Sequence, residues 1–188
     1  MSNQRAAFWK NNMNFGAIAG LAIIIVTVLF YFLNLEQNYV ISFIIYAVLI
    51  GVIITGTRYL RDKILFGHIT YGRALGSGTS ISLFASVIVA FYTFMFLKFI
   101  DTGAIEKMFS LMEDNMYQQG MPEEQIDMAM EMSRKFTTPF TIALGTVFSY
   151  VFWGFLFSLI TSIFIKKKSN SYDAAMSEIE KEINEENK

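Results

Sequence analysis

Four long runs of uncharged, mostly apolar residues constrain this chain more than any other feature of its sequence. The first two, Phe15–Leu33 and Tyr39–Thr57, are nineteen residues each. The third is solidly apolar over Ile81–Leu97, and the fourth covers Phe140–Ile165. At 1.5 Å per residue, a nineteen-residue helix reaches roughly 29 Å, about the thickness of the hydrocarbon core of a bilayer. These lengths are typical of helices that cross a membrane.

The composition favours four membrane spans over four core helices of a soluble protein. Of the 188 residues, 54% are hydrophobic and 16% are charged, whereas soluble domains carry about 25% charged residues. That polar material is too scarce to cover four such helices in water. We therefore predict an all-α fold, an integral membrane four-helix bundle formed by residues 1–168. Its expected spans are 15–33, 39–57, 75–99 and 139–165.

The basic residues predict the orientation, because Lys and Arg concentrate in cytoplasmic flanks. Arg5 and Lys10 precede the first span, and Lys166–Lys168 follow the fourth, whereas the connection 34–38 has no basic residue. The connection between the second and third spans carries Arg58, Arg61, Lys63 and Arg73. This pattern places both termini and that second connection in the cytoplasm, with 34–38 and 101–138 outside.

The third connection, 101–138, is too long for a plain loop. Apolar residues recur within it at helical spacing, which predicts a helix from about Ala104 to Gln118. Gly120 is a good terminator, and Pro122 followed by two glutamates is a good start for a second helix. We expect a helical hairpin on the outer side, with an acidic surface and a methionine-rich interior.

Seven of the eleven methionines lie in this hairpin: Met108, Met112, Met116, Met121, Met128, Met130 and Met132. Thioethers are soft ligands that suit Cu(I), so a copper site is one interpretation. Flexible methionines also fill irregular cores and partner-binding faces, and no His or Cys assists these ones. We favour contact with a partner protein, through Met108, Met112, Met116, Ile126 and Met130.

Chemistry-bearing residues are scarce. The chain has no Cys and a single His, His68, and its formal net charge is −1, which gives no case for nucleic-acid binding. The first, second and fourth runs contain no Asp, Glu, Lys, Arg or His, and Lys98 at the outer end of the third can snorkel to the interface. We expect no enzymatic activity, no cofactor and no metal site. The four basic residues of the second connection either bind lipid phosphates or only fix the topology.

Small residues let helix backbones approach closely in lipid and so can mark helix contacts, but Gly is also simply common in membrane helices, and the sequence leaves both interpretations open. Three pairs are spaced by four: Gly16 with Gly20, Gly72 with Gly76, and Gly145 with Ser149. A polar stripe on the third span predicts burial against other helices; it consists of Ser77, Thr79, Ser80, Ser82 and Ser86. Residues 169–188 form a polar cytoplasmic tail, in which Met176, Ile179 and Ile183 either mark a short amphipathic helix or belong to a frayed segment.

Several local motifs resemble a known family. They are Gly16–Gly20, the stretch Gly67–Gly78, Phe99–Asp101, Met121–Ile126, and Ser158–Ile160 before the lysine triplet. Together they cover the chain from about Asn14 to Lys168 and are similar to the four-helix membrane proteins of Bacteroidetes known as domain of unknown function 4199. The resemblance implies the inner membrane of a Gram-negative cell, with the hairpin in the periplasm. It implies no reaction, cofactor or catalytic residue.

These observations favour an inner-membrane scaffold or accessory subunit of an envelope complex. Such a protein acts by contact, as a homo-oligomer or as a subunit of a larger assembly, among membrane lipids. The alternative is a small channel or transporter that forms on oligomerisation.

The predicted topology can be tested with single cysteines, because the natural chain has none. Asp114→Cys, in the hairpin, should react with an impermeant thiol reagent in intact cells. Asp62→Cys, in the second connection, should react only after the cells are lysed. Labelling of position 62 but not of position 114 in intact cells would contradict the orientation.

Overall fold

The computed structural model describes residues 2–33, 35 and 39–167, together with Met176, Ile179 and Ile183 in the tail. Within this part of the chain the fold is all-helical, and four helices are long and apolar enough to span a membrane. They are α1 (Ser2–Phe32), α2 (Tyr39–Tyr59), α3 (Tyr71–Met95) and α6 (Pro139–Ile165). The predicted all-α four-span architecture is confirmed. Predictions for the first connection (except Leu35) and for the remainder of the tail lie outside the described residues.

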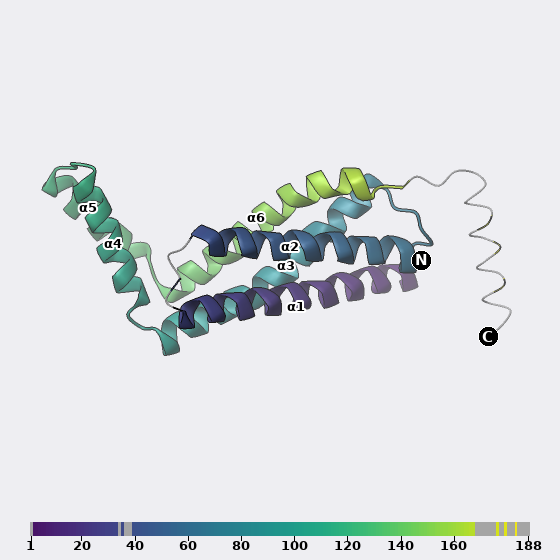
Figure 1. Ribbon diagram of the computed structural model, residues 1–188, viewed down its shortest axis with the longest axis horizontal. Coiled ribbons are helices and arrows are strands. Elements are labelled where there is room, and N and C mark those ends of the chain that lie inside the picture. Colours follow the sequence, from purple (N-terminus) through teal and green to yellow (C-terminus); the bar gives the residue numbers. More distant parts are fainter. Residues whose placement is uncertain are drawn as a thin grey trace.

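Two shorter helices, α4 (Ala104–Gln118) and α5 (Glu123–Phe136), form a hairpin between α3 and α6. The bounds of α4 agree with the prediction from its apolar spacing. Short π-helical turns extend α2 (Leu60–Ile64) and α3 (Phe96–Ile100). Figure 1 shows the hairpin projecting obliquely beyond one end of the bundle, while the α2–α3 connection lies at the other end.

The third helix is the centre of the bundle. It contacts α6 most extensively and α1 next, and it also touches α2. The four long helices run side by side, so that the start of α1 and the end of α6 share one end (Figure 1). The helix α1 begins at Ser2, well before the uncharged run at Phe15, because the preceding polar residues contain no helix breaker. An uncharged run therefore marks the membrane core of a helix and underestimates its length.

Small residues bring α3 and α6 into close contact at two reciprocal points. A Cβ added at Gly78 would overlap the Ser158 hydroxyl, and one added at Gly154 would overlap Ser82. Ser82 Oγ donates to Gly78 O at 3.0 Å, and Ser158 Oγ donates to Gly154 O at 2.6 Å. Because each hydroxyl is satisfied by a carbonyl of its own helix, both serines act here as small, non-crowding side chains.

The α1–α3 contact uses the predicted Gly16–Gly20 pair. A Cβ at Gly20 would lie 3.0 Å from the Ile88 Cβ, and one at Gly16 would lie 2.9 Å from the Ile81 carbonyl oxygen. The other predicted pairs do not mark contacts, because a Cβ added at Gly72, Gly76 or Gly145 would meet no atom within 4 Å. A four-residue spacing of small residues therefore does not by itself show whether that face of a helix contacts another helix.

The polar stripe of α3 is buried as predicted at three positions. Ser77, Ser82 and Ser86 are fully buried, while Thr79 and Ser80 are partly buried. Large apolar side chains instead cover the outside of the bundle; on α6 they recur every four residues, at Phe140, Leu144, Phe148 and Phe152. This inside-out distribution is the one expected for helices surrounded by lipid.

A capping box starts α6 and separates it from the hairpin. Thr138 Oγ1 accepts from Thr141 N at 3.2 Å, and Thr138 N donates to Thr141 Oγ1 at 2.8 Å. Pro139 occupies the first helical position, where its missing N–H costs no hydrogen bond. The chain therefore changes direction at Thr137–Thr138, and α5 and α6 are separate helices.

The Gly154 contact yields a matched test within one helix. Gly154→Ala should destabilise the bundle by about 1–3 kcal/mol, because the new methyl group overlaps Ser82. Gly145→Ala meets open space and should be neutral or stabilising by up to about 1 kcal/mol through helix propensity. Unfolding of the purified protein in mixed micelles, followed by circular dichroism, measures both. Equal stability of the two variants would show that α3 and α6 do not approach each other at Gly154.

Candidate functional site

The hairpin has a small apolar core of its own. Phe109 of α4 is buried together with Ile126 and Met130 of α5. Met112 and Met116 pack half-buried against this cluster. Four of the five residues predicted for partner contact therefore hold the two helices of the hairpin together: Met112, Met116, Ile126 and Met130.

A second row of apolar side chains remains exposed on the hairpin, and Met108, the fifth predicted contact residue, belongs to it. Met108 and Leu111 lie beside the core positions of α4, at 43% and 42% exposure. Met128, Met132 and Phe136 follow one another every four residues on α5 and are about two-thirds exposed. Because the two helices are antiparallel, their helical registers place Met108 and Leu111 on the same side of the hairpin as Met132 and Phe136, with Met128 at the outer edge of this surface. We call these five residues the exposed apolar face.

The opposite side of the hairpin is polar and is closed by Arg134. Its Nη1 donates to Glu106 Oε1 at 2.6 Å, and its guanidinium lies 4.7 Å from the centre of the Phe109 ring. Both partners of this ion pair are substantially exposed, so the pair contributes at most about 1 kcal/mol. The contact fixes the end of α5 to the beginning of α4 and leaves the exposed apolar face uncovered.

The net charge of the hairpin is concentrated at its tip. Residues 113–127 contain five acids and no base, whereas three acids and three bases occupy the rest of 101–138. Tyr117 lies among these acids: its pKa is raised, first by desolvation and then by the negative charges of Glu123, Glu113 and Asp127. A negative potential therefore surrounds the far end of the hairpin, while its base near the bundle is neutral.

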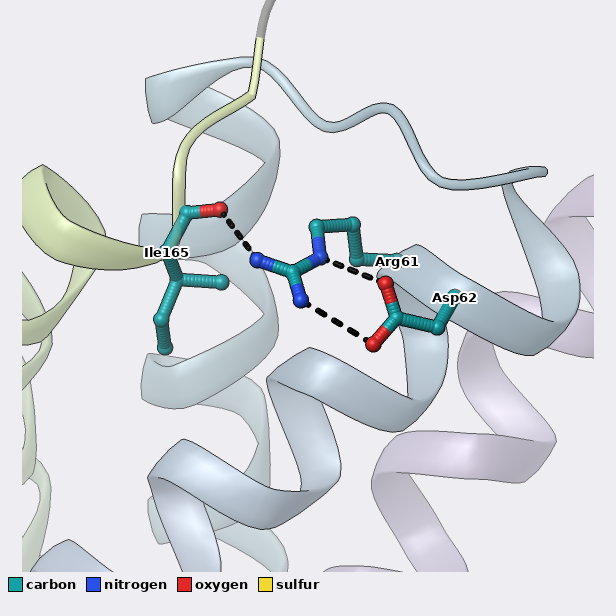
Figure 2. A network of polar contacts seen from close by, with 3 residues as sticks. All are labelled: Arg61, Asp62 and Ile165. Atoms are coloured by element: carbon teal, nitrogen blue, oxygen red, sulfur yellow. Dashed lines mark hydrogen bonds and ion pairs between the residues drawn. The ribbon is translucent and has the colours of Figure 1, made fainter.

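At the other end of the bundle, Arg61 ties α2 to the last turn of α6 (Figure 2). Its Nη1 donates to the carbonyl oxygen of Ile165 at 3.1 Å, and its Nε and Nη2 donate to the Asp62 carboxylate at 2.7 and 3.0 Å. A cation at the C-terminus of a helix satisfies free carbonyls and opposes the negative end of the dipole. Arg61, predicted to bind lipid phosphate, has its guanidinium engaged within the protein.

The remaining predicted phosphate ligands, Arg58, Lys63 and Arg73, are exposed at this same end. Beside them the α2–α3 connection pairs with the chain that leaves α6. Ile69 N donates to Lys167 O at 3.1 Å, and Lys167 N donates to Ile69 O at 3.0 Å. An apolar cluster underlies this pairing; it consists of Leu60, Leu65, Ile69, Ala74 and Ile165. We call the Arg61 contact and the Ile69–Lys167 pairing the end clamp.

A buried polar cluster, which sequence reasoning missed, joins three helices just inside the clamp. Asn11 Nδ2 donates to the Gly56 carbonyl of α2 and to Asn12 Oδ1, both at 3.2 Å. Ser77 Oγ of α3 donates to the same Asn12 oxygen at 2.8 Å. Both asparagines precede the uncharged run of the first span, which is why attention to that run overlooked them. The signal in the sequence was a pair of adjacent asparagines, Asn11 and Asn12, just before the apolar run of the first span, at the same end of the bundle as the serine stripe of α3.

Several polar atoms of this region have no hydrogen-bond partner among the described residues. They include Asn11 Oδ1, Asn12 Nδ2 and the hydroxyl of Thr57, all on residues at most 5% exposed. Buried polar groups normally have partners, and ordered water is the usual one where protein groups are missing. The cluster is thus the part of the bundle interior best suited to hold water.

The comparisons place this architecture in a family. The family model described as "Protein of unknown function (DUF4199)" matches residues 14–167. The chain belongs to this family. The matched region takes in the four spans, the hairpin and the end clamp, and it confirms the resemblance seen in the sequence motifs. No curated protein and no solved structure matches the chain.

The Asn12–Ser77 hydrogen bond can be measured in this DUF4199 protein by a double-mutant cycle. Asn12→Ala and Ser77→Ala should each destabilise the fold, and the double variant should lose about 0.5–1.5 kcal/mol less than the sum. Thr79→Ala is the control, because Thr79 bonds its own helix at Leu75 O. Unfolding free energies in mixed micelles supply the numbers. Additivity of Asn12→Ala with Ser77→Ala would show that α1 and α3 are not coupled there.

Proposed function

We propose that this protein is an inner-membrane scaffold or accessory subunit of an envelope complex, and that it acts by protein contact through its hairpin. The observation that carries the proposal is the exposed apolar face. The hairpin makes few contacts with the bundle, buries one set of apolar residues internally, and leaves Met108, Leu111, Met128, Met132 and Phe136 open. Exposed apolar patches on an otherwise polar element mark sites of interaction.

The expected partner is a protein with an apolar surface bordered by basic residues. Methionine side chains adapt to different apolar surfaces. The acidic tip, 113–127, would meet the basic border and favour encounter with such a partner. The charge asymmetry of the flanks supports a periplasmic hairpin and cytoplasmic termini, because the Lys and Arg residues gather at the opposite end of the bundle.

The interior of the bundle supports contact over transport. The reciprocal Gly–Ser contacts bring α3 and α6 together, and the uncharged runs of α1, α2 and α6 supply no Asp, Glu, Lys, Arg or His for a proton relay. The helix α6 also continues through Gly145 and Gly154 without a break, whereas transporter sites often use interrupted helices.

A small oligomeric channel or transporter is the second candidate. The observation that favours it is the buried polar cluster, where Asn11 Oδ1 and the Thr57 hydroxyl are buried without a partner among the described residues and Asn11 Nδ2 donates to the Gly56 carbonyl. Oxygen atoms of this kind coordinate cations in membrane proteins. The cluster lies near one end of the bundle, so a conducting path would require further oxygens along the interior.

Affinity purification after crosslinking in cells tests the contact proposal. Met132→Glu places a charge in the exposed apolar face and should lower recovery of the partner roughly tenfold or more, because interface centres tolerate truncation and charge poorly. Ser110→Glu adds the same charge on the polar side of α4 and should recover the partner normally. Equal melting temperatures of the two variants show that folding is intact.

Two outcomes would contradict the proposal. One is a set of co-purifying proteins that is identical for Met132→Glu and the unmodified chain. The other is an oligomer of this chain alone that conducts ions in planar bilayers, which would favour the channel.

A further inference from the structure

An apolar groove opens between α3 and α6 in the half of the bundle nearest the hairpin. Its volume is about 430 Å³, which falls within the roughly 300–1,000 Å³ of typical ligand pockets. Ala90 and Ala143 are nearly buried and form the floor. The rings of Phe91, Phe94 and Phe140 border the space. Every residue that lines the groove is apolar, so it suits a hydrocarbon occupant.

A cation lies above this groove, at the end of α3. The Lys98 ammonium is 5.3 Å from the centre of the Phe94 ring, which is itself part of the groove wall, and 5.6 Å from the Phe99 ring. Lys98 is exposed, and its helix ends at Ile100, so the ammonium lies where a membrane-spanning helix reaches the interface.

No described acidic residue forms an ion pair with Lys98. The nearest acid along the chain, Asp101, accepts instead from Lys107 Nζ at 3.4 Å and from Tyr31 OH at 3.5 Å. The positive charge of Lys98 is therefore available to an anion from outside the protein, and its contact with the Phe94 ring keeps the ammonium beside the groove.

We propose that the groove and Lys98 together bind one membrane phospholipid, with an acyl chain between Phe91 and Phe140 and the phosphate at the Lys98 ammonium. The groove lies within the spans, where the surrounding medium already offers acyl chains. Its Phe94 wall lies beside a cation at the interface, where lipid phosphates are found. Both parts of one lipid molecule thus meet matching chemistry on adjacent turns of α3.

The charge of Lys98 also predicts a headgroup preference. Phosphatidylglycerol carries a net negative charge, whereas the ammonium group of phosphatidylethanolamine offsets its phosphate. A single interfacial Lys should favour the anionic lipid by roughly fivefold. The groove binds the acyl chains of both lipids equally well. It should therefore determine how much lipid is retained, and not which headgroup is preferred.

Native mass spectrometry of the full chain tests this site. The protein is reconstituted into vesicles of equal parts phosphatidylethanolamine and phosphatidylglycerol, extracted in a mild detergent, and examined for lipid that stays bound. We expect one retained lipid per chain, enriched in phosphatidylglycerol. Lys98→Gln should remove the enrichment while lipid is still retained.

Two groove variants separate acyl binding from folding. Phe140→Ala removes an exposed groove wall, so it should reduce retention of both lipids severalfold at little cost in stability. Phe148→Ala is the matched control, since Phe148 is equally exposed on the same helix but does not line the groove. Ala143→Leu fills the groove from its floor and should also reduce retention.

The proposal is overturned if Phe140→Ala and Phe148→Ala retain lipid equally, or if Lys98→Gln keeps the preference for phosphatidylglycerol. It is also overturned if the unmodified chain appears as a lipid-free dimer that Phe140→Ala dissociates, because the groove would then hold a second copy. Neither result bears on partner recovery by the hairpin, so the proposed contact function is tested separately.

Discussion

The close approach of α3 and α6 is the contact on which the rest of the structure depends. A bilayer supplies no hydrophobic force between helices, so association relies on packing and interhelical hydrogen bonds. Gly78 with Ser158, and Gly154 with Ser82, let the two backbones come together without an unsatisfied hydroxyl. Because the hairpin leaves the end of α3 and returns at the start of α6, the pairing of these two helices also keeps its two attachment points at the same end of the bundle.

The two ends of the bundle differ in how firmly they are held. At one end, Arg61, the Ile69–Lys167 pairing and the Asn12–Ser77 bond connect all four long helices, and an apolar cluster lies beneath them. At the other end, the hairpin extends from the bundle with few contacts (Figure 1). Elements with few tertiary contacts move and adapt most readily. The geometry thus separates a firmly connected end of the bundle from a hairpin end with few tertiary contacts, where the proposed binding surface lies.

The helices could be predicted from the sequence because they follow from local patterns of residues. The contacts between helices could not be predicted, because they depend on which helix faces pair in the fold. Apolar run length and residue spacing gave the four spans and the bounds of α4. The four-residue spacing of small residues selected Gly145 on α6, whereas the contact with α3 uses Gly154. The face of α6 that contains Gly154 is the inner one because it lies against Ser82 of α3, and the sequence of α6 alone does not show this. Similarly, a basic residue next to a membrane span in the sequence is interpreted as a topology signal or as a ligand for lipid phosphate. That Arg61 caps α6 follows from Ile165, more than one hundred residues away.

The charge distribution of the hairpin is compatible with both proposals, a lipid bound at Lys98 and a protein bound at the exposed apolar face. Its base is electrically neutral and adjoins Lys98, the residue proposed to bind a lipid phosphate. Its tip carries five acids without a base, and anionic headgroups would repel it. A two-helix unit cannot bury every apolar side chain it carries, so Met128, Met132 and Phe136 remain available along a surface that the tip holds away from the bilayer. Under the proposed topology, repulsion at the tip would keep the exposed apolar face out of the bilayer, where the proposed protein partner could reach it.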